Sequence, residues 1–278
     1  MGSISPAPDP EILPPNDGFD PPASRARRER PSWAATPATY LLVGINCAVF
    51  LAMTLRGVNP ISPSPDQLFY NWGANHAGAV LIGGQWWRIV TAMFVHVGIL
   101  HLATNMWCLW NLGLLAEPLI GSAGLLAVYL LTGAAGNLLS TLYNWWKDHT
   151  LGAFSVGAGA SGAVFGIAGA LIVLLKSDLL PVPPLELRKL RRSVIYFAAI
   201  NLIIGFTISL GVVVAHTGIQ IDNSAHLGGV LCGLLFAAPM VPRIGSDRKS
   251  FLNRLRLSVG MVIGILVLFG FYLAQLPR

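Results

Sequence analysis

The feature that most limits the fold of this chain is a series of long apolar runs that carry almost no charge. The 278-residue sequence is 54% hydrophobic and 11% charged, and its mean hydropathy is +0.63. Apolar runs of about 20 residues are long enough to cross a bilayer as helices. They do not alternate between apolar and polar residues, as the strands of a membrane β-barrel do. The sequence therefore predicts an all-α fold, a polytopic bundle of membrane helices.

Seven membrane helices are expected, and they divide the chain into three parts. Residues 1–33, rich in proline and arginine, are expected to be a disordered cytoplasmic tail. Residues 34–240 would form a six-helix core, and 241–278 a basic loop with one additional C-terminal transmembrane helix. The expected helices are 38–55, 89–115, 123–143, 161–175, 194–214, 223–239 and 257–273.

The basic residues predict how the chain is oriented in the bilayer. If the N-terminus is cytoplasmic, 14 of the 18 Lys and Arg residues fall on the cytoplasmic side, as the positive-inside rule requires. These residues are Arg25, Arg27, Arg28, Arg30, Lys176, Arg188, Lys189, Arg191, Arg192, Arg243, Arg248, Lys249, Arg254 and Arg256. We therefore expect a cytoplasmic N-terminus, an extracytoplasmic C-terminus and, as the location, the bacterial inner membrane. Basic residues clustered in short loops do not indicate a nucleic-acid partner, and none is expected.

Ser161 lies in a run of glycines and alanines, 157–166, that leads directly into an apolar stretch. Small neighbours leave a hydroxyl accessible and backbone N–H groups nearby, which an activated nucleophile requires. The same composition is also typical of plain helix packing in membranes. A helix over 161–175 would be about 22 Å long, shorter than the ~30 Å apolar core of a bilayer. Its start is therefore expected below the outer surface, in a recessed site that contains water.

Polar residues inside membrane helices are costly and indicate function. They occur in three of the expected helices: His96, His101 and Asn105 in the second, Ser161 in the fourth, and His226 in the sixth. All three helices run from outside to inside, and the polar residues lie in the first half of each. We therefore expect them at a similar depth, in one site.

Residue spacing indicates which faces meet. His101 and Asn105 share one helix face, because they are four residues apart. Two stripes of small residues would allow the fourth and sixth helices to pack closely. They are Gly162, Gly166 and Ala170 on one helix, and Gly229 and Gly233, on the same face as His226, on the other. Phe165 lies one turn after Ser161 and could pack against the His226 ring.

Other candidate residues have simpler interpretations. For His96 we favour a structural hydrogen bond in a loop over a direct chemical role. Asp222 precedes His226 by four residues and could be the acid of a triad, but aspartate at a helix start is commonly an N-cap. Asn223 is interpreted in the same way. Glu117 closes the second helix on the cytoplasmic side and is expected to tie helices together.

Taken together, these motifs resemble those of the rhomboid intramembrane serine proteases. The resemblance covers about residues 38–240. The matching motifs are Gly159-Ala160-Ser161-Gly162, His226 with Gly229 and Gly233, His96 with His101 and Asn105, Trp87-Arg88, and Glu117. The helix at 257–273 resembles the extra C-terminal helix of the family's six-plus-one members. Some members carry tyrosine where this chain has Phe165, so only a packing role carries over.

The resemblance implies an intramembrane serine endopeptidase that acts by a Ser161–His226 dyad. The oxyanion hole would come from His101, Asn105 and the Ser161 backbone N–H, with support from Gly159, Gly162, Phe165, Gly229, Gly233 and His96. The substrate would be a peptide bond in or near the transmembrane segment of another membrane protein. No cofactor and no metal are implied.

Three other classes were weighed. One is a catalytically silent rhomboid-like protein that escorts membrane clients. Another is a metal protein using His96, His101 and His226, although the HExxH pattern and in-membrane carboxylate ligands are missing. The third is a transporter or ion channel, which would be expected to have inverted repeats and ionisable residues at the membrane centre, and the sequence shows neither.

Overall fold

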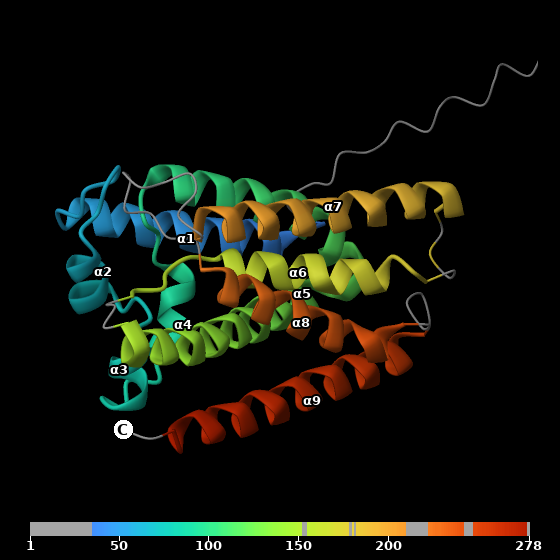
Figure 1. Cartoon of the computed structure of the whole chain (residues 1–278). Helices are drawn as coiled ribbons and strands as arrows, with labels where there is room; N and C mark the ends of the chain where they lie inside the picture. Colours follow the sequence, from blue (N-terminus) through green and yellow to red (C-terminus); the bar gives the residue numbers. More distant parts are fainter. Residues whose placement is uncertain are drawn as a thin grey trace, which may run out of the picture.

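The computed structural model describes residues 35–151, 155–177, 180, 182–209, 222–241 and 247–276. The expected N-terminal tail, 1–33, lies outside these residues. Within them the chain forms an all-α bundle, in agreement with the sequence (Figure 1). Its helices are α1 (Pro37–Leu55), α2 (Pro65–Trp72), α3 (Ala77–Leu81), α4 (Arg88–Thr91), the 3₁₀ turn η1 (Ala92–Phe94), α5 (Ile99–Leu151), α6 (Ser161–Leu174), α7 (Pro184–Ser209), α8 (Asn223–Ala237), the 3₁₀ turn η2 (Ala238–Met240) and α9 (Arg248–Ala274).

Among the described residues, four helical spans are long and apolar enough to cross a membrane. They are α1, α5 over Ile99–Asp148, α8 extended to Met240, and α9. The backbone of α5 leaves the helical conformation at Gly121, where φ is +71°, and Pro118 lies just before it. The chain reverses there, so α5 forms two rods, 99–120 and 122–151, that correspond to the second and third expected helices (Figure 1).

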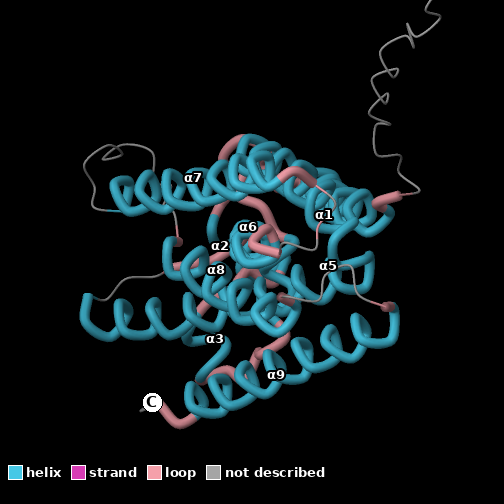
Figure 2. The backbone as a smooth tube through the Cα atoms, turned by 90° about the vertical axis from the view of Figure 1, so that its right-hand side faces the viewer, coloured by secondary structure: helices cyan, strands magenta, loops and turns pink. Residues whose placement is uncertain are grey.

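The shorter apolar helix α6 is the centre of the bundle. Every residue from Gly162 to Leu171 is buried, so no side of this helix is left for lipid. A helix that is apolar all round belongs inside other helices. Figure 2 shows α6 near the middle of the molecule, with α1, α5, α7 and α8 around it and α9 at the periphery. The residue that opens α6, Ser161, is thereby held by elements from most of the chain.

Three of the expected helix starts lie well away from those in the structure. The second expected helix began at residue 89, but α5 begins at Ile99, because the chain turns at Gly98, where φ is +91°. The fifth and seventh were expected at 194 and 257, but α7 begins at Pro184 and α9 at Arg248. Lys and Arg are good helix formers, so the basic stretches extend these helices rather than forming loops. The expected end of the fifth helix, 214, lies outside the described residues.

The segment between α1 and α5, residues 57–98, folds back on itself around Arg88. This side chain is 4% exposed and donates from Nη1 to the carbonyl oxygens of Phe69 (2.8 Å) and Ala74 (2.9 Å). Its Nε donates to Gln85 Oε1 (2.6 Å), and its guanidinium lies 4.3 Å from the centre of the Phe69 ring. Because burial disfavours the charged form, the pKa of Arg88 is lowered from its ordinary value. Through its hydrogen bonds, Arg88 connects Phe69, Ala74 and Gln85 within the 57–98 segment.

Glu117 ties α1 to the turn between the two rods of α5. Its carboxylate accepts from the backbone N–H groups of Ala38 (2.9 Å) and Thr39 (2.8 Å), which belong to the first turn of α1. The hydroxyls of Thr39 (2.7 Å) and Ser122 (2.6 Å) donate to the same carboxylate. A carboxylate at a helix N-terminus satisfies donors that have no partner within the helix. Glu117 thus lies at the opposite end of the bundle from Ser161.

Candidate active site

Ser161 is the first residue of α6. It is partly exposed, whereas the helix behind it is buried. The bond from Val164 N–H to the Ala160 carbonyl (2.9 Å) is the first of the helical type, so the Ser161 N–H lies outside the helical ladder. The first N–H groups of a helix have no partner within it. The start of α6 therefore presents a hydroxyl and a backbone donor together.

His226 lies in the first turn of the neighbouring helix, α8. Its ring is 8% exposed and stacks on the ring of Phe165, with centroids 4.2 Å apart and planes inclined by 14°. Phe165 lies one turn beyond Ser161 on α6, so this stacking holds the imidazole beside the start of α6. In the conformation of the described residues the Ser161 hydroxyl and the His226 ring are not hydrogen-bonded to each other. Catalytic hydrogen bonds commonly tighten only when substrate is bound.

Glycines bring α6 and α8 into backbone contact. A Cβ added at Gly229 would collide with the carbonyl oxygen of Gly162, and one at Gly233 with that of Gly166. A Cβ at Gly162 would lie 3.3 Å from the carbonyl oxygen of Ala225, the residue before His226. The two stripes of small residues therefore face each other as the sequence predicts. Their contact sets the spacing between the helices that carry Ser161 and His226.

The residues just before α6, 155–160, are called the nucleophile loop here. Gly159, in this loop, has φ of +120°, a conformation that L side chains rarely adopt. A Cβ on Gly159 would also lie 2.6 Å from Cε1 of the His101 ring. Both the backbone conformation and the space thus require glycine here. As a result, His101 lies against the backbone two residues before Ser161.

His101 and Asn105 both lie in the first turns of α5. His101 Nδ1 accepts from the Val97 N–H (3.4 Å), which leaves the proton of a neutral ring on Nε2. That Nε2 faces Gly159 and could donate into the space beside Ser161. Asn105 is 6% exposed and donates from Nδ2 to the His101 carbonyl oxygen (3.0 Å).

His96 lies in the turn between η1 and α5, not in a helix as expected. The turn forms because Val95 is extended and Gly98 has positive φ. The His96 side chain is fully buried, its Nδ1 lies 3.3 Å from the Phe94 carbonyl oxygen, and its ring centroid is 5.4 Å from that of His101. This is the loop hydrogen bond that we favoured for His96, and it packs the ring behind His101.

Asp222 is the N-cap of α8. Its Oδ1 accepts from the Ala225 N–H (3.1 Å) and from the Ser224 hydroxyl, and its Oδ2 accepts from the Ser140 hydroxyl. The buried Nδ1 of His226, which the acid of a triad would contact, has no hydrogen-bond partner among the described residues. This geometry is that of a cap on α8.

We predict that Asp222→Ala retains most of the cleavage activity. The variant removes the cap, so the free energy of unfolding should fall by about 0.5–2 kcal/mol. Asp222→Asn, which can still cap, is the matched control. Cleavage rates and thermal unfolding of the three proteins check this, and an activity loss as large as that of His226→Ala would restore Asp222 as a triad acid.

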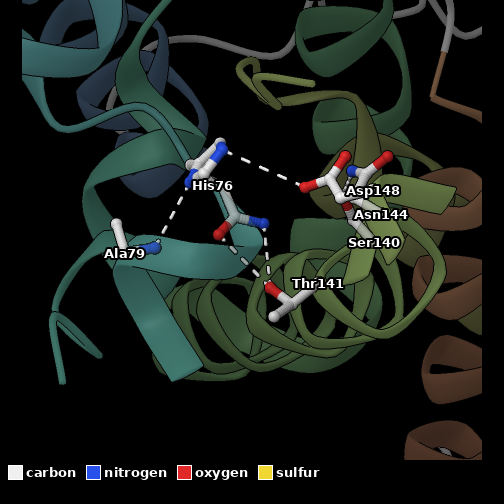
Figure 3. Close-up of polar contacts among 7 residues, drawn as sticks. His76, Ala79, Ser140, Thr141, Asn144 and Asp148 are labelled. Atoms are coloured by element: carbon white, nitrogen blue, oxygen red, sulfur yellow. Dashed lines mark hydrogen bonds and ion pairs between the residues drawn. The ribbon is translucent and has the colours of Figure 1, made fainter. Parts of the chain in front are cut away.

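The second rod of α5 carries a band of polar residues that was not predicted from the sequence. Asn137, Ser140, Thr141 and Asn144 are all buried, and their spacing of three to four residues puts them on one helix face. Figure 3 shows Ser140, Thr141, Asn144 and Asp148 on the side of α5 that faces His76 and Ala79 of the 57–98 segment. The signal in the sequence was the helical spacing of these polar residues within an apolar stretch.

Among the residues that the structure describes, His, Cys, Asp and Glu side chains do not gather in groups of three that could hold a metal ion. The two histidine rings nearest to each other, His96 and His101, are occupied by backbone groups on their Nδ1 atoms. Near the start of α6, the His226 ring stacks on Phe165 and the His101 ring lies against Gly159.

Comparison with known proteins identifies the family of the chain. Residues 83–243 match the family model described as the rhomboid domain. The chain is 30% identical over 229 residues to the rhomboid protease GluP of Bacillus subtilis, an alignment that covers 82% of this chain and 39% of the relative. It is also 30% identical over 228 residues to the rhomboid protease AarA of Providencia stuartii, covering 78% and 76%. The RHOMBOID-like protein 6, mitochondrial, of Arabidopsis thaliana is 32% identical over 197 residues, covering 70% and 57%.

Two statements follow from the comparisons and the apolar helices. The chain is an integral membrane protein that crosses the bilayer several times. The relatives named as proteases support a protease activity. This chain spans about two fifths of GluP's length and about three quarters of AarA's, so the activity and substrates of the whole relatives are carried over only as proposals.

Proposed function

Because the chain belongs to the rhomboid family, we propose that it is an intramembrane serine endopeptidase with a Ser161–His226 dyad. The observation that carries the proposal is the placement of these residues. Ser161 opens α6, His226 lies in the first turn of α8, and the two helices are in backbone contact at Gly162 and Gly229. The Phe165 ring holds the imidazole against α6.

The chemistry proceeds in two steps. Ser161 Oγ attacks the carbonyl carbon of the scissile peptide bond while His226 accepts the hydroxyl proton. His226 then donates that proton to the leaving amine as the C–N bond breaks, which leaves an acyl group on Ser161. In the second step a water molecule attacks the acyl carbon while His226 accepts one of its protons. The bond from the acyl carbon to Ser161 Oγ then breaks, and His226 returns the proton to Oγ, which releases the new carboxyl end and regenerates the serine.

The negative charge of each tetrahedral intermediate needs donors beside Ser161. The candidates are the Ser161 N–H, which lies outside the helical ladder, the proton-bearing Nε2 of His101, and the Asn105 amide. The contact between the His101 ring and Gly159, two residues before Ser161, supports this role for His101. In this arrangement Asn105 would exchange its bond to the His101 carbonyl for one to the oxyanion.

The proposed substrate is the transmembrane segment of another membrane protein. A helix in lipid satisfies its own backbone groups, so the bond to be cleaved must lie where the segment can unwind. Ser161 at the end of α6 would meet such a segment near the membrane surface. The positive-inside distribution of Lys and Arg supports a site on the extracytoplasmic side and a cytoplasmic N-terminus. The proposed location is the inner membrane of a bacterial cell.

We predict that Asn105→Ala lowers kcat by about 10²–10³-fold, the usual effect of removing one oxyanion donor. KM should change little, because the donor acts in the transition state. Asn111→Ala is the matched control, since Asn111 makes the same bond to the carbonyl four residues earlier (2.7 Å, to Trp107) but is exposed. Equal rates for Asn105→Ala and wild type would remove Asn105 from the mechanism.

The experiment that tests the function is reconstitution of the purified protein in liposomes with a tagged, single-span membrane substrate. The wild-type protein should release one product pair, cut in or near the transmembrane segment, and EDTA should not reduce the rate. If wild type does not cleave several such substrates but does retain them on purification, the silent escort function is supported instead.

A further inference from the structure

Backbone hydrogen bonds attach the nucleophile loop to the 57–98 segment at two points, and Val156 and Ala158 of the loop also pack against apolar residues of that segment. Asn75 and Gly157 form an antiparallel bridge, in which the Asn75 N–H donates to the Gly157 carbonyl (2.7 Å) and the Gly157 N–H to the Asn75 carbonyl (2.8 Å). The Gly159 N–H donates to the carbonyl of Ala92 (2.9 Å). Gly157 lies four residues before Ser161, so the bridge holds the loop close to the nucleophile.

The Asn75 side chain is in turn held by α5. It is 1% exposed, and its Nδ2 donates to the Asn137 carbonyl (3.1 Å) and to Thr141 Oγ1 (3.1 Å). Its Oδ1 lies 3.3 Å from the same hydroxyl. An amide nitrogen has two protons, so both donations are possible at once. The second rod of α5, the 57–98 segment and the nucleophile loop are therefore connected through Asn75.

The neighbours of Asn75 are fixed independently of it. Arg88 donates to the Ala74 carbonyl (2.9 Å), and His76 Nδ1 accepts from the Ala79 N–H (3.2 Å), which caps α3. On its other side the His76 ring faces Asp148, with Nε2 and Oδ2 4.0 Å apart (Figure 3). Burial lowers the pKa of His76, partly offset by Asp148, and a neutral ring can keep accepting at Nδ1. The residues on both sides of Asn75, Ala74 and His76, are therefore held by hydrogen bonds of their own.

We propose that Asn75 is a positioning residue for the nucleophile, which acts through Gly157 and does not touch substrate. The inference rests on the proposed function of Ser161. A loop rich in glycine has high conformational freedom when unfolded, so contacts from outside must hold it in one conformation. Small displacements of a catalytic group are costly in rate, about 10²-fold for 1 Å. Of the two hydrogen-bonded contacts to the loop, the one from Asn75 is the farther from α6.

The test measures loop protection and catalysis on the same proteins. In Asn75→Ala, backbone amides of 155–160 should exchange with deuterium faster than in wild type. The value of kcat for a membrane substrate should fall about 10–100-fold with KM nearly unchanged, and labelling of Ser161 by a fluorophosphonate should slow in parallel. Thr141→Val should change the exchange rate, kcat and the labelling rate in the same direction but less. Thr141→Ser, which keeps the hydroxyl, should have wild-type values. The double variant of Asn75→Ala and Thr141→Val should show less than the sum of the two single effects, because both remove the same contact.

Asn59→Ala is the matched control. Asn59 lies in the same 57–98 segment and accepts from the N–H groups of Ile61 (2.9 Å) and Ser62 (3.2 Å), but its bonds stay within that segment. It should match wild type in exchange of 155–160 and in kcat.

Each outcome decides the proposal. The proposal is overturned if the amides of 155–160 exchange with deuterium at the wild-type rate in Asn75→Ala. It is also overturned if they exchange faster but kcat is unchanged, or if only KM changes. If wild type neither cleaves substrate nor labels at Ser161, the proposed function fails. The exchange comparison then still decides whether Asn75 holds the loop.

Discussion

Ser161→Ala should abolish cleavage of a membrane substrate, with a loss of about 10⁴-fold or more in kcat. Alanine removes the attacking oxygen and leaves the helix start intact, because Ser161 makes no side-chain cap in α6. The variant should therefore insert into membranes and unfold thermally like wild type. His226→Ala should have an effect of similar size, since the imidazole and hydroxyl act as one unit.

The control for Ser161→Ala is a substitution of another serine that is close to the site but takes no part in the proposed reaction. Ser224→Ala serves, because Ser224 lies two residues before His226 and its hydroxyl donates to the cap residue Asp222. This control should keep most of its activity. The double variant of Ser161→Ala and His226→Ala should be no worse than either single variant. Cleavage by Ser161→Ala at the wild-type rate would show that another group is the nucleophile.

Gly229→Val should be the most damaging substitution outside the dyad. A side chain at this position has no space, because the carbonyl oxygen of Gly162 lies where its Cβ would be. Either α8 moves away from α6 or the backbone of one helix distorts. Overpacking of this kind destabilises by about 1–3 kcal/mol or more. It would also separate His226 from Ser161, so cleavage should fall at least about 10²-fold.

The control for that substitution is Gly260→Val on α9. Gly260 also lies in an apolar helix, but a Cβ there would meet nothing within 4 Å. Thermal unfolding in detergent and the rate of Ser161 labelling measure both effects. If Gly229→Val unfolds and labels like Gly260→Val, the contact between α6 and α8 does not set the geometry of the site.

The sequence was sufficient for the membrane class, and for placing Ser161 and His226 near the starts of two helices whose glycine stripes meet. These predictions succeeded because each property depends on residues that are close together in the sequence. Apolar length, the positions of Ser161 and His226 near helix starts, and the glycine stripes can all be read from spacing within one helix. The cap at Asp222 is equally local, since its partner Ala225 is three residues away.

What could not be predicted depends on contacts between distant segments. Asn75 looks like an ordinary loop residue until the fold places it between Asn137, more than sixty residues later, and Gly157. His96 was assigned to a helix because apolar residues continue through 89–98, and only the positive φ of Gly98 ends that run. The basic stretches at 188–192 and 248–256 suggested loops by charge, although their residues are good helix formers.

The most direct test of the dyad is to treat the purified wild-type protein with a fluorophosphonate and locate the adduct by mass spectrometry. The account predicts one adduct, on the peptide that contains Ser161, and its loss in both Ser161→Ala and His226→Ala. An adduct on a different serine, or equal labelling of Ser161 without His226, would contradict it.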